Sequence, residues 1–172
     1  VEEQTYNEYI NSLSSPTALA ILEINPMSGL TLLEFSPIIS IEIINRMLGG
    51  SGGCMQTTRS FTEIDLTLLQ RIMSHITNLI DASWSKVLKV STTLKKIETS
   101  PQFAQITSYN ETIAIITLHV KIGDKTEGFI NFCIPHIAIE PIAKQLNTKL
   151  WYTSESAELS SEHYESIKRK VA

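Results

Sequence analysis

The sequence predicts an α+β fold in which two similar hairpin-and-helix units share one antiparallel sheet. The 172 residues are 42% hydrophobic and 19% charged, which is typical of a globular domain. Two segments, "FSPIISIEIINRML" from Phe35 and "CIPHIAIEPIAKQL" from Cys133, align without gaps, and each follows a predicted hairpin. The alternative is a chance match of two Ile-rich helices. Because the match extends to the hairpins, we favour an internal duplication with pseudo-twofold symmetry.

Ahead of the first unit, apolar residues at helical spacing predict a short amphipathic helix over residues 2–13. "ALAILEIN" and "GLTLLEF" then predict a hairpin, joined by the turn "NPMSG". Pro37 is expected to open a helix that runs to about Leu48, and Gly49 and Gly50 end it. The expected apolar face of this helix comprises Ile41, Ile44 and Leu48.

The longest predicted helix lies in "RSFTEIDLTLLQRIMSHITNLIDASWSKV", and Trp84 extends its apolar stripe. Thr62 is a good N-cap residue, and Asp65, three residues on, supplies the acid of a capping box. The expected apolar stripe comprises Ile64, Leu68, Ile72, Ile76, Leu79 and Ile80.

A second β region is expected from about Val87, with strands in "PQFAQIT", "TIAIITLHVKIG" and "EGFINFCIP". Pro135 then opens a helix through Leu146. We therefore expect one domain over residues 1–148 and a polar linker with a terminal helix over 149–172. The chain lacks an initiator Met, so we expect it to be a fragment of a longer protein.

Composition disfavours several functions. The net charge is −4 and basic residues gather only in "KVLKVSTTLKK" and "IKRK", so nucleic acid is not an expected partner. No apolar run is as long as a membrane-spanning helix, and no signal peptide is visible. Cys54 and Cys133 have no metal-site spacing and are interpreted as free thiols, with a disulfide between them left open.

Four of the seven glycines lie within five residues, in "GGSGG" from Gly49 to Gly53. A phosphate-binding loop would need Lys-Ser or Lys-Thr after its last glycine, or a preceding strand, and the sequence has neither. Two interpretations remain: a helix C-cap with a flexible connection, or a loop that a partner's backbone approaches closely. The second unit lacks these glycines, which favours the interpretation that the loop contacts a partner.

No catalytic or metal site is predicted. The four histidines are His75, His119, His136 and His163. They are scattered, without an acid at ligand spacing, and no motif joins a nucleophile to a base. We therefore expect neither an enzyme nor a cofactor.

Six ordered blocks carry a family resemblance: "NSLSSPTALAILEINPMSGLTLLEFSP", "INRMLGGSGG", "RSFTEIDLTLLQRIM", "DASW", "SPQFAQI" and "INFCIPHIAIEPIAKQL". Together they resemble the middle domain of the FliM family of flagellar motor switch proteins, over roughly residues 6–148. The resemblance implies a place in the cytoplasmic C-ring, peripheral to the inner membrane at the flagellar basal body. It also implies that the middle domain of FliG binds at a GGxG motif.

The implied FliG-binding residues are Gly49, Gly50, Ser51, Gly52 and Gly53, with Met47, Met55 and Arg59 as flanking candidates. Met adapts to irregular partner surfaces, although ordinary packing would also explain both methionines. Arg59 is a candidate charge contact, with a solvated role as the alternative. An Asp at Gly50 or Gly52 is expected to abolish FliG binding and to leave the fold intact.

The resemblance further implies a pseudo-symmetric α/β/α fold like that of the CheC and CheX phosphatases. Other implied partners are neighbouring FliM copies, FliN through an absent C-terminal domain, and phospho-CheY through an absent N-terminal segment. A CheC-like phosphatase is the rival hypothesis, but its ExxN motif is missing. Three positions after Glu63 the residue is Leu66, and three positions after Glu140 it is Ala143. A structural ring subunit without signal relay is a third possibility.

Overall fold

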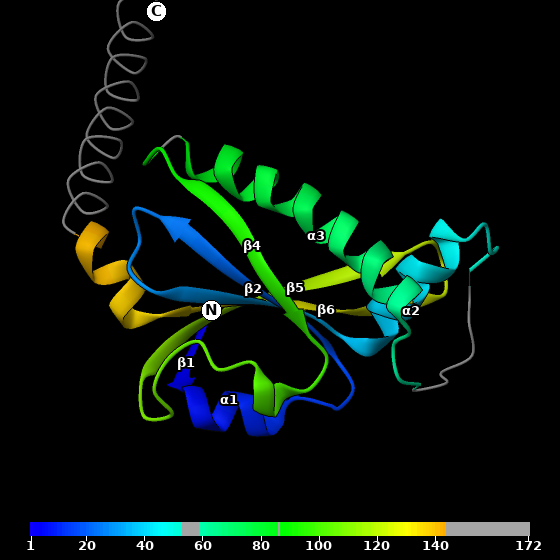
Figure 1. Cartoon of the computed structure of the whole chain (residues 1–172), viewed down its shortest axis with the longest axis horizontal. Helices are drawn as coiled ribbons and strands as arrows, with labels where there is room; N and C mark the ends of the chain where they lie inside the picture. Colours follow the sequence, from blue (N-terminus) through cyan, green and yellow to red (C-terminus); the bar gives the residue numbers. More distant parts are fainter. Residues whose placement is uncertain (53–58, 86, 144–172) are drawn as a thin grey trace, which may run out of the picture. The chain divides into compact units, whose positions relative to one another are not determined.

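The computed structural model of the chain describes residues 1–52, 59–85 and 87–143 (Figure 1). The chain divides into two compact parts, Val1–Ile139 and Glu140–Ala172, which differ from the two repeated units. The first part contains every labelled helix and strand. The expected linker and terminal helix over residues 149–172 lie outside the described residues.

The described part of the chain contains both strands and helices, in the following order. The first half contains β1 (Glu2–Thr5), α1 (Tyr6–Ser12), β2 (Ala18–Asn25), β3 (Leu30–Phe35) and α2 (Pro37–Met47). The second half contains α3 (Glu63–Trp84), β4 (Ser91–Glu98), a 3-10 helix η1 (Pro101–Phe103), β5 (Thr112–Ile122) and β6 (Thr126–Pro135). Residues 136–143 are helical and follow β6 directly.

The six strands form one antiparallel sheet in the order β1-β5-β6-β3-β2-β4. The two hairpins, β2–β3 and β5–β6, meet through the central pairing of β3 with β6. In this pairing Leu32 lies opposite Cys133, and Phe35 lies opposite Ile130. Ile130 lies 98 residues after Leu32, and Cys133 lies 98 residues after Phe35, which is the offset of the repeat. The two pairs therefore exchange under the repeat, and the predicted duplication is confirmed as a pseudo-twofold axis between β3 and β6.

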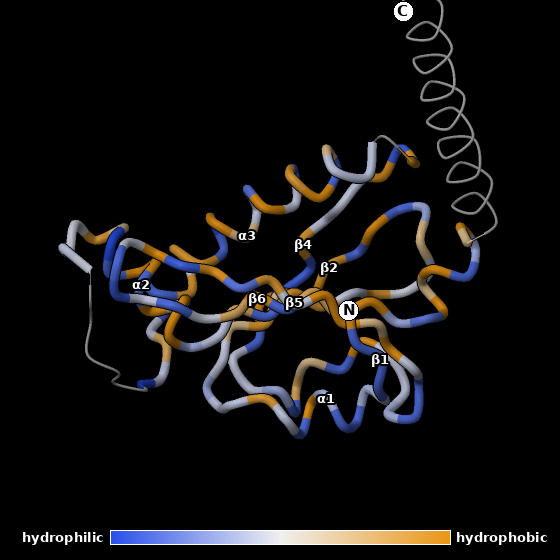
Figure 2. The backbone as a smooth tube through the Cα atoms, turned by 180° about the vertical axis from the view of Figure 1, so that it is seen from behind, coloured by the Kyte–Doolittle hydropathy of each residue, from blue (hydrophilic) through white to orange (hydrophobic). Residues whose placement is uncertain are grey.

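Helices cover both faces of the sheet, with α2 and α3 on one face and α1 on the other (Figures 1 and 2). The strand residues alternate between these two cores, as the pleat requires. In β2, Leu19 and Ile21 pack with α1, whereas Ala20 and Leu22 pack with α2 and α3. This layered arrangement is the α/β/α fold that the sequence predicts.

Two segments differ from the expected secondary structure. The predicted helix over residues 2–13 is wrong in its first turn, because residues 2–5 pair with β5 as the edge strand β1. Thr5 then caps α1 with a capping box to Glu8. The predicted strand in "PQFAQIT" is also wrong, because Pro101–Phe103 form a 3-10 helix. Pro101 suits the first turn of a helix, where its missing N–H leaves no bond unmade.

The predicted start of α3 is confirmed, because Thr62 and Asp65 form the expected capping box. Of its predicted apolar stripe, Leu68, Ile76 and Ile80 are partly buried and pack against the core, as expected. Ile64 and Leu79 are exposed instead of buried. The four buried side chains of α3 are those of Asp65, Leu69, Met73 and Thr77. In the same way, Leu48 is exposed although it was expected on the apolar face of the preceding helix.

Candidate partner-binding surface

The end of α2 fixes the first half of the glycine motif. The Gly49 N–H donates to the Arg46 carbonyl at 3.0 Å, and the Gly50 N–H donates to the Asn45 carbonyl at 2.8 Å. Gly49 has a φ of +88°, in the left-handed region. This pattern is a Schellman motif, which closes a helix by satisfying its last carbonyls. Gly49 and Gly50 therefore have a structural role as a C-cap, the first of the two interpretations left open by the sequence.

Gly52 has a different environment. Its φ is +80°, and a Cβ at this position would lie 2.5 Å from Glu42 Oε1 and 2.6 Å from Arg46 Nη2. The backbone of the loop thus lies directly against an ion pair in which Arg46 Nε donates to Glu42 Oε1 at 2.7 Å. A helix C-cap does not require this second close approach.

The Arg46 guanidinium also reaches the second hairpin. A Cβ at Gly123, in the turn between β5 and β6, would lie 2.7 Å from Arg46 Nη2. Figure 1 shows this turn and the end of α2 at the same end of the sheet. Arg46 therefore lies between the glycine motif and the β5–β6 turn, and it donates to the carboxylate of Glu42. The Glu42 side chain is only 2% exposed.

The outer surface of the motif is open. Leu48 is 64% exposed, and Gly49, Gly50 and Ser51 are exposed as well. An apolar side chain next to uncovered backbone amides and carbonyls is suited to contact with another protein. We name residues 48–52 the glycine loop.

Of the other predicted site residues, Met47 and Arg59 lie within the described part of the chain. Met47, the last residue of α2, is half-buried. Gly53 and Met55 lie outside the described residues, as does Cys54. Cys133 is fully buried with a free thiol, as expected.

Arg59 belongs to the N-terminal cap of α3. Its Nη2 donates to Asp65 Oδ1 at 3.0 Å, and its Nη1 bonds Asp65 Oδ2. Asp65 also accepts from the backbone N–H of Thr62 at 2.8 Å. The hydrogen bond from Arg59 is the main cause that lowers the pKa of Asp65, and it outweighs the burial that would raise this pKa. The Arg59 side chain is 45% exposed, so its role in the cap leaves room for an external contact.

The Glu42–Arg46 pair was missed in the sequence. Its signal was the i, i+4 spacing of opposite charges in "EIINR". That spacing is usually found on exposed helix faces, where such a pair contributes little. Only the fold shows that Glu42 is buried and that the pair supports the loop.

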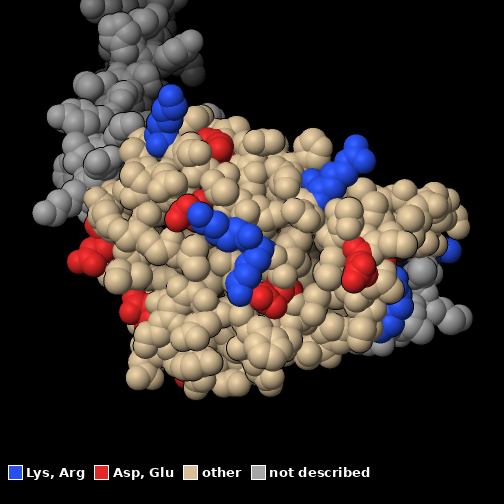
Figure 3. Space-filling view, in the orientation of Figure 1, with Lys and Arg blue, Asp and Glu red and all other residues tan. Residues whose placement is uncertain are grey.

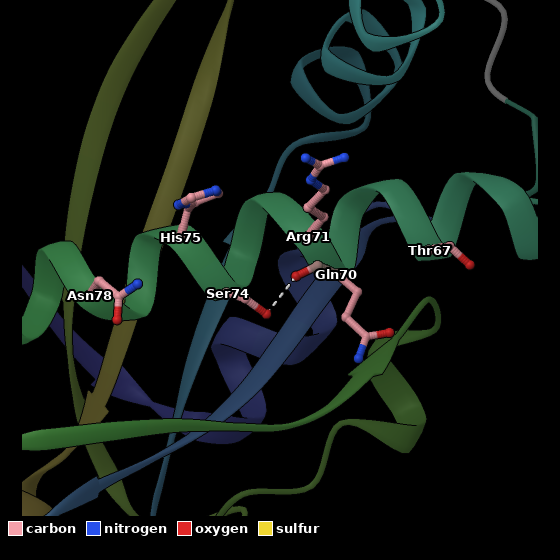
Figure 4. A pocket seen from close by; sticks show the side chains of 6 residues that line it. All are labelled: Thr67, Gln70, Arg71, Ser74, His75 and Asn78. Atoms are coloured by element: carbon pink, nitrogen blue, oxygen red, sulfur yellow. Dashed lines mark hydrogen bonds between the residues drawn. The ribbon is translucent and has the colours of Figure 1, made fainter.

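A shallow, open hollow of about 440 Å³ lies along α3, next to Gln70, Arg71, Ser74 and His75 (Figure 4). Figure 4 shows Arg71 and His75 on one side of the helix and Gln70 and Ser74 on the other. The Ser74 hydroxyl donates to the Gln70 carbonyl at 2.8 Å. Ser74 and His75 therefore do not form a serine–histidine pair.

A space-filling view in the orientation of Figure 1 shows few charges on this face, with basic and acidic side chains interspersed (Figure 3). On β4, Lys95 pairs with Glu23 and Lys96 pairs with Glu98. No group of three or more potential metal ligands occurs within residues 1–52, 59–85 and 87–143. No helix in the described part of the chain is long and apolar enough to cross a membrane.

Comparison with known proteins agrees with this architecture. The family model "Flagellar motor switch protein FliM" matches residues 1–151. The flagellar motor switch protein FliM of Treponema pallidum is 38% identical over 154 residues, which are 90% of this chain and 44% of that protein. The FliM protein of Borreliella burgdorferi is 37% identical over 172 residues, 99% of this chain and 49% of that protein. The chain thus spans about half the length of these relatives.

Solved structures show the same fold. A FliG–FliM complex from H. pylori contains a chain with a TM-score of 0.77 and 35% identity, covering 82% of this chain and 77% of the other. The FliM middle domain from H. pylori has a TM-score of 0.75 and 33% identity, covering 84% and 77%. FliY of Thermotoga maritima, at 17% identity and a TM-score of 0.74 over 86% and 79%, shows the fold alone.

The pseudo-symmetric sheet between helix layers, with one glycine loop at the end of α2, places the molecule in the α/β/α class that these structures share. The matched residues extend over most of the chain. The chain belongs to the FliM family of flagellar motor switch proteins.

Proposed function

We propose that this chain is the middle part of a flagellar motor switch protein and binds FliG through the glycine loop. The carrying observation is an exposed loop whose backbone is supported by contacts with the rest of the fold. The Schellman motif sets Gly49 and Gly50, and the Glu42–Arg46 pair supports Gly52. The similarity to the chain of the FliG–FliM complex supports the assignment of the partner.

A preformed loop favours binding for a physical reason. Ordering a flexible segment costs free energy at the moment of association, and a loop already fixed by its own protein avoids this cost. The exposed Leu48 would supply apolar area, while the Gly49–Ser51 backbone would allow close approach. Gly53, Met55 and Arg59 extend the proposed contact beyond the loop.

In the whole protein, we assign this domain to signal relay in the C-ring. Phospho-CheY arrives mainly on an N-terminal segment, and FliN binds through a C-terminal domain. Neighbouring FliM copies contact the domain from the side, and its movement reorients FliG to reverse rotation. The site of action is cytoplasmic, at the base of the flagellum, and the domain acts without catalysis.

The CheC-like phosphatase alternative is not favoured. Glu63 is exposed in the first turn of α3, but the residue three positions on is the aliphatic Leu66, which is half-buried. An aliphatic side chain cannot orient a hydrolytic water. Addition of the chain should therefore leave the decay rate of phospho-CheY unchanged.

The test is calorimetric titration of the chain with purified FliG middle domain. Leu48→Glu should weaken binding strongly, because it places a charge in the centre of the apolar contact. Phe103→Glu is the matched control, because Phe103 is 68% exposed on η1, near the α1 layer of the sheet. Equal affinity of the wild type and the Leu48→Glu variant would contradict the proposal.

A further inference from the structure

A second hollow lies on the α1 side of the sheet, apart from the glycine loop. It is a groove of about 290 Å³ between the end of α1 and the strands β1, β3, β5 and β6. Ser12 and Leu13 form its rim on the helix side, and Thr117 and Phe129 form its wall on the sheet side. We name it the Glu34 groove, after the carboxylate at its base.

Glu34 is an acidic residue in the interior of the fold. It is 5% exposed and lies on β3, directly opposite Asn131 on β6. Its Oε2 accepts from the Tyr9 hydroxyl at 3.1 Å and from Asn131 Nδ2 at 2.7 Å. Its Oε1 lies 3.3 Å from the Thr17 hydroxyl, which shares its single proton with the nearer Phe35 carbonyl at 3.0 Å. The carboxylate is thus oriented by three donors, two of which also line the groove.

All three donors are neutral. A carboxylate has about four acceptor positions, so three donors leave room for one more, and they do not cancel its charge. Among the described residues that line the groove there is no Lys or Arg, whereas Glu2 adds a second carboxylate. A buried charge without a counter-charge is costly, and a cation in the groove would offset that cost.

The wall of the groove also suits a cation. Phe129 is 49% exposed, and its ring contacts the ring of His119 edge-on, with centroids 5.4 Å apart. The face of an aromatic ring attracts positive charge. Leu13 adds an apolar surface at the rim that would cover an alkyl chain.

We propose that the Glu34 groove binds a single alkylammonium or alkylguanidinium group, with the charge at Glu34 and the alkyl chain between Leu13 and Phe129. The volume of about 290 Å³ is large enough for one such chain. The group comes either from a small free amine or from a Lys or Arg side chain of a protein. Both sources share the same chemistry.

The experiment is titration of the isotopically labelled chain with butylammonium, followed by NMR of the backbone amides. Saturable shifts are expected at Glu34, Phe129 and Asn131, whereas the neutral isostere butanol should give none. Glu34→Gln should weaken binding about tenfold or more, because a charge-assisted hydrogen bond is lost. Glu23→Gln is the control with the same charge change outside the groove, and it should bind as the wild type does.

Thr117→Lys provides a second variant if Glu34→Gln loses its dispersed spectrum. Thr117 is exposed on the groove wall, so a lysine there would occupy the groove and block the probe. Butylammonium binding that survives either substitution, or equal shifts with butanol, would overturn the proposal. N-acetyl-lysine amide separates the two sources. Binding as tight as that of butylammonium indicates a protein side chain, and much weaker binding indicates a free amine.

Discussion

Arg46 donates to the buried carboxylate of Glu42 and, with the same guanidinium, lies against both Gly52 and Gly123. One side chain thus connects helix α2, the glycine loop and the turn between the last two strands. Because Gly52 and Gly123 have no Cβ, the guanidinium fits between two stretches of backbone. The conformation of the proposed FliG-binding loop therefore depends on an ion pair beneath it.

Substitution of Arg46 should separate the effect of this buried pair from that of an ordinary surface pair. Arg46→Met should lower the free energy of unfolding by about 1–3 kcal/mol, because Glu42 then loses a cation in a site that is mostly shielded from water. Lys95→Met is the matched control. Both cations are 44% exposed, but the Glu23 partner of Lys95 is 37% exposed, so its loss should cost less than about 1 kcal/mol. Denaturant unfolding measures both, and equal losses would argue against a special role for Arg46.

Alanine substitutions at Gly29, Gly49 and Gly52 should lower the free energy of unfolding by amounts that depend on the surroundings of each glycine. Gly29 and Gly49 have φ values of +79° and +88° with nothing near an added Cβ, so each Ala variant should lose about 1–2 kcal/mol from backbone strain. Gly52→Ala should lose more, because its Cβ would also meet Glu42 and Arg46. FliG titration separates them further. Gly29→Ala should bind normally, and Gly52→Ala should bind weakly.

This ranking revises the expected effect of Asp at Gly50 or Gly52. A Cβ at Gly50 would lie 2.1 Å from Asn45 Oδ1, and one at Gly52 would meet the ion pair. Either Asp would disturb the loop itself and not only the contact with a partner. Ser51→Asp is the cleaner test of FliG docking, since Ser51 is exposed. It should weaken FliG binding and leave the unfolding free energy within about 0.5 kcal/mol.

The cap of α3 predicts an acid-sensitive contribution to stability. Asp65→Asn should cost about 1–2 kcal/mol at pH 7, because Thr62 and Arg59 lose an ionised partner. The folded state lowers the pKa of Asp65 below its ordinary value of 3.8, so this contribution is fully present above that value. It is lost as the pH falls further, through the pKa of the folded state.

The difference between wild type and Asp65→Asn should therefore shrink in unfolding experiments below about pH 3.8. Glu63→Gln removes a neighbouring exposed acid in the same helical turn and serves as the control. Its effect should be below about 1 kcal/mol. A pH-independent difference for Asp65→Asn would show that the carboxylate is not the stabilising group.

The packing of α3 supplies the last prediction. Leu69 is fully buried and Leu79 is exposed, although the sequence pattern placed Leu79 on the apolar stripe. Leu69→Ala should cost about 2–5 kcal/mol, whereas Leu79→Ala should change stability by less than about 0.5 kcal/mol. Thermal unfolding of the two variants tests whether Leu69 packs on the sheet and Leu79 does not.

The sequence predicted the two hairpins, α2, the cap of α3 and the shared sheet, because these follow from local pattern and from the repeat. The prediction failed where contacts with residues of other segments determine the structure. Ile64 is apolar but lies at the exposed start of α3, while the polar Asp65 is buried with Arg59. The strand β1 was missed because its residues gain a partner only when β5 is beside them.

The glycine loop was singled out from the sequence, but the contacts that support it were not predicted, and its role in binding stays a prediction. Four clustered glycines marked the loop, yet the roles of Glu42 and Arg46 depend on Gly123, which is more than 70 residues away in the sequence. Sequence spacing contains no information on such a contact. The Glu34 groove was missed for the same reason, because Tyr9, Thr17 and Asn131 come together only in the folded sheet.

Leu32–Cys133 and Phe35–Ile130 exchange under the repeat across the centre of the sheet. Each repeated unit can therefore serve as an internal control for the other. Ser36 and Pro37 at the start of α2 correspond to Ile134 and Pro135 at the end of β6, 98 residues on. One of the two equivalent units has the glycine loop, and the other continues into "NTKLW". A paired substitution at corresponding positions thus compares the same local architecture with and without the loop, inside a single chain and under identical solution conditions.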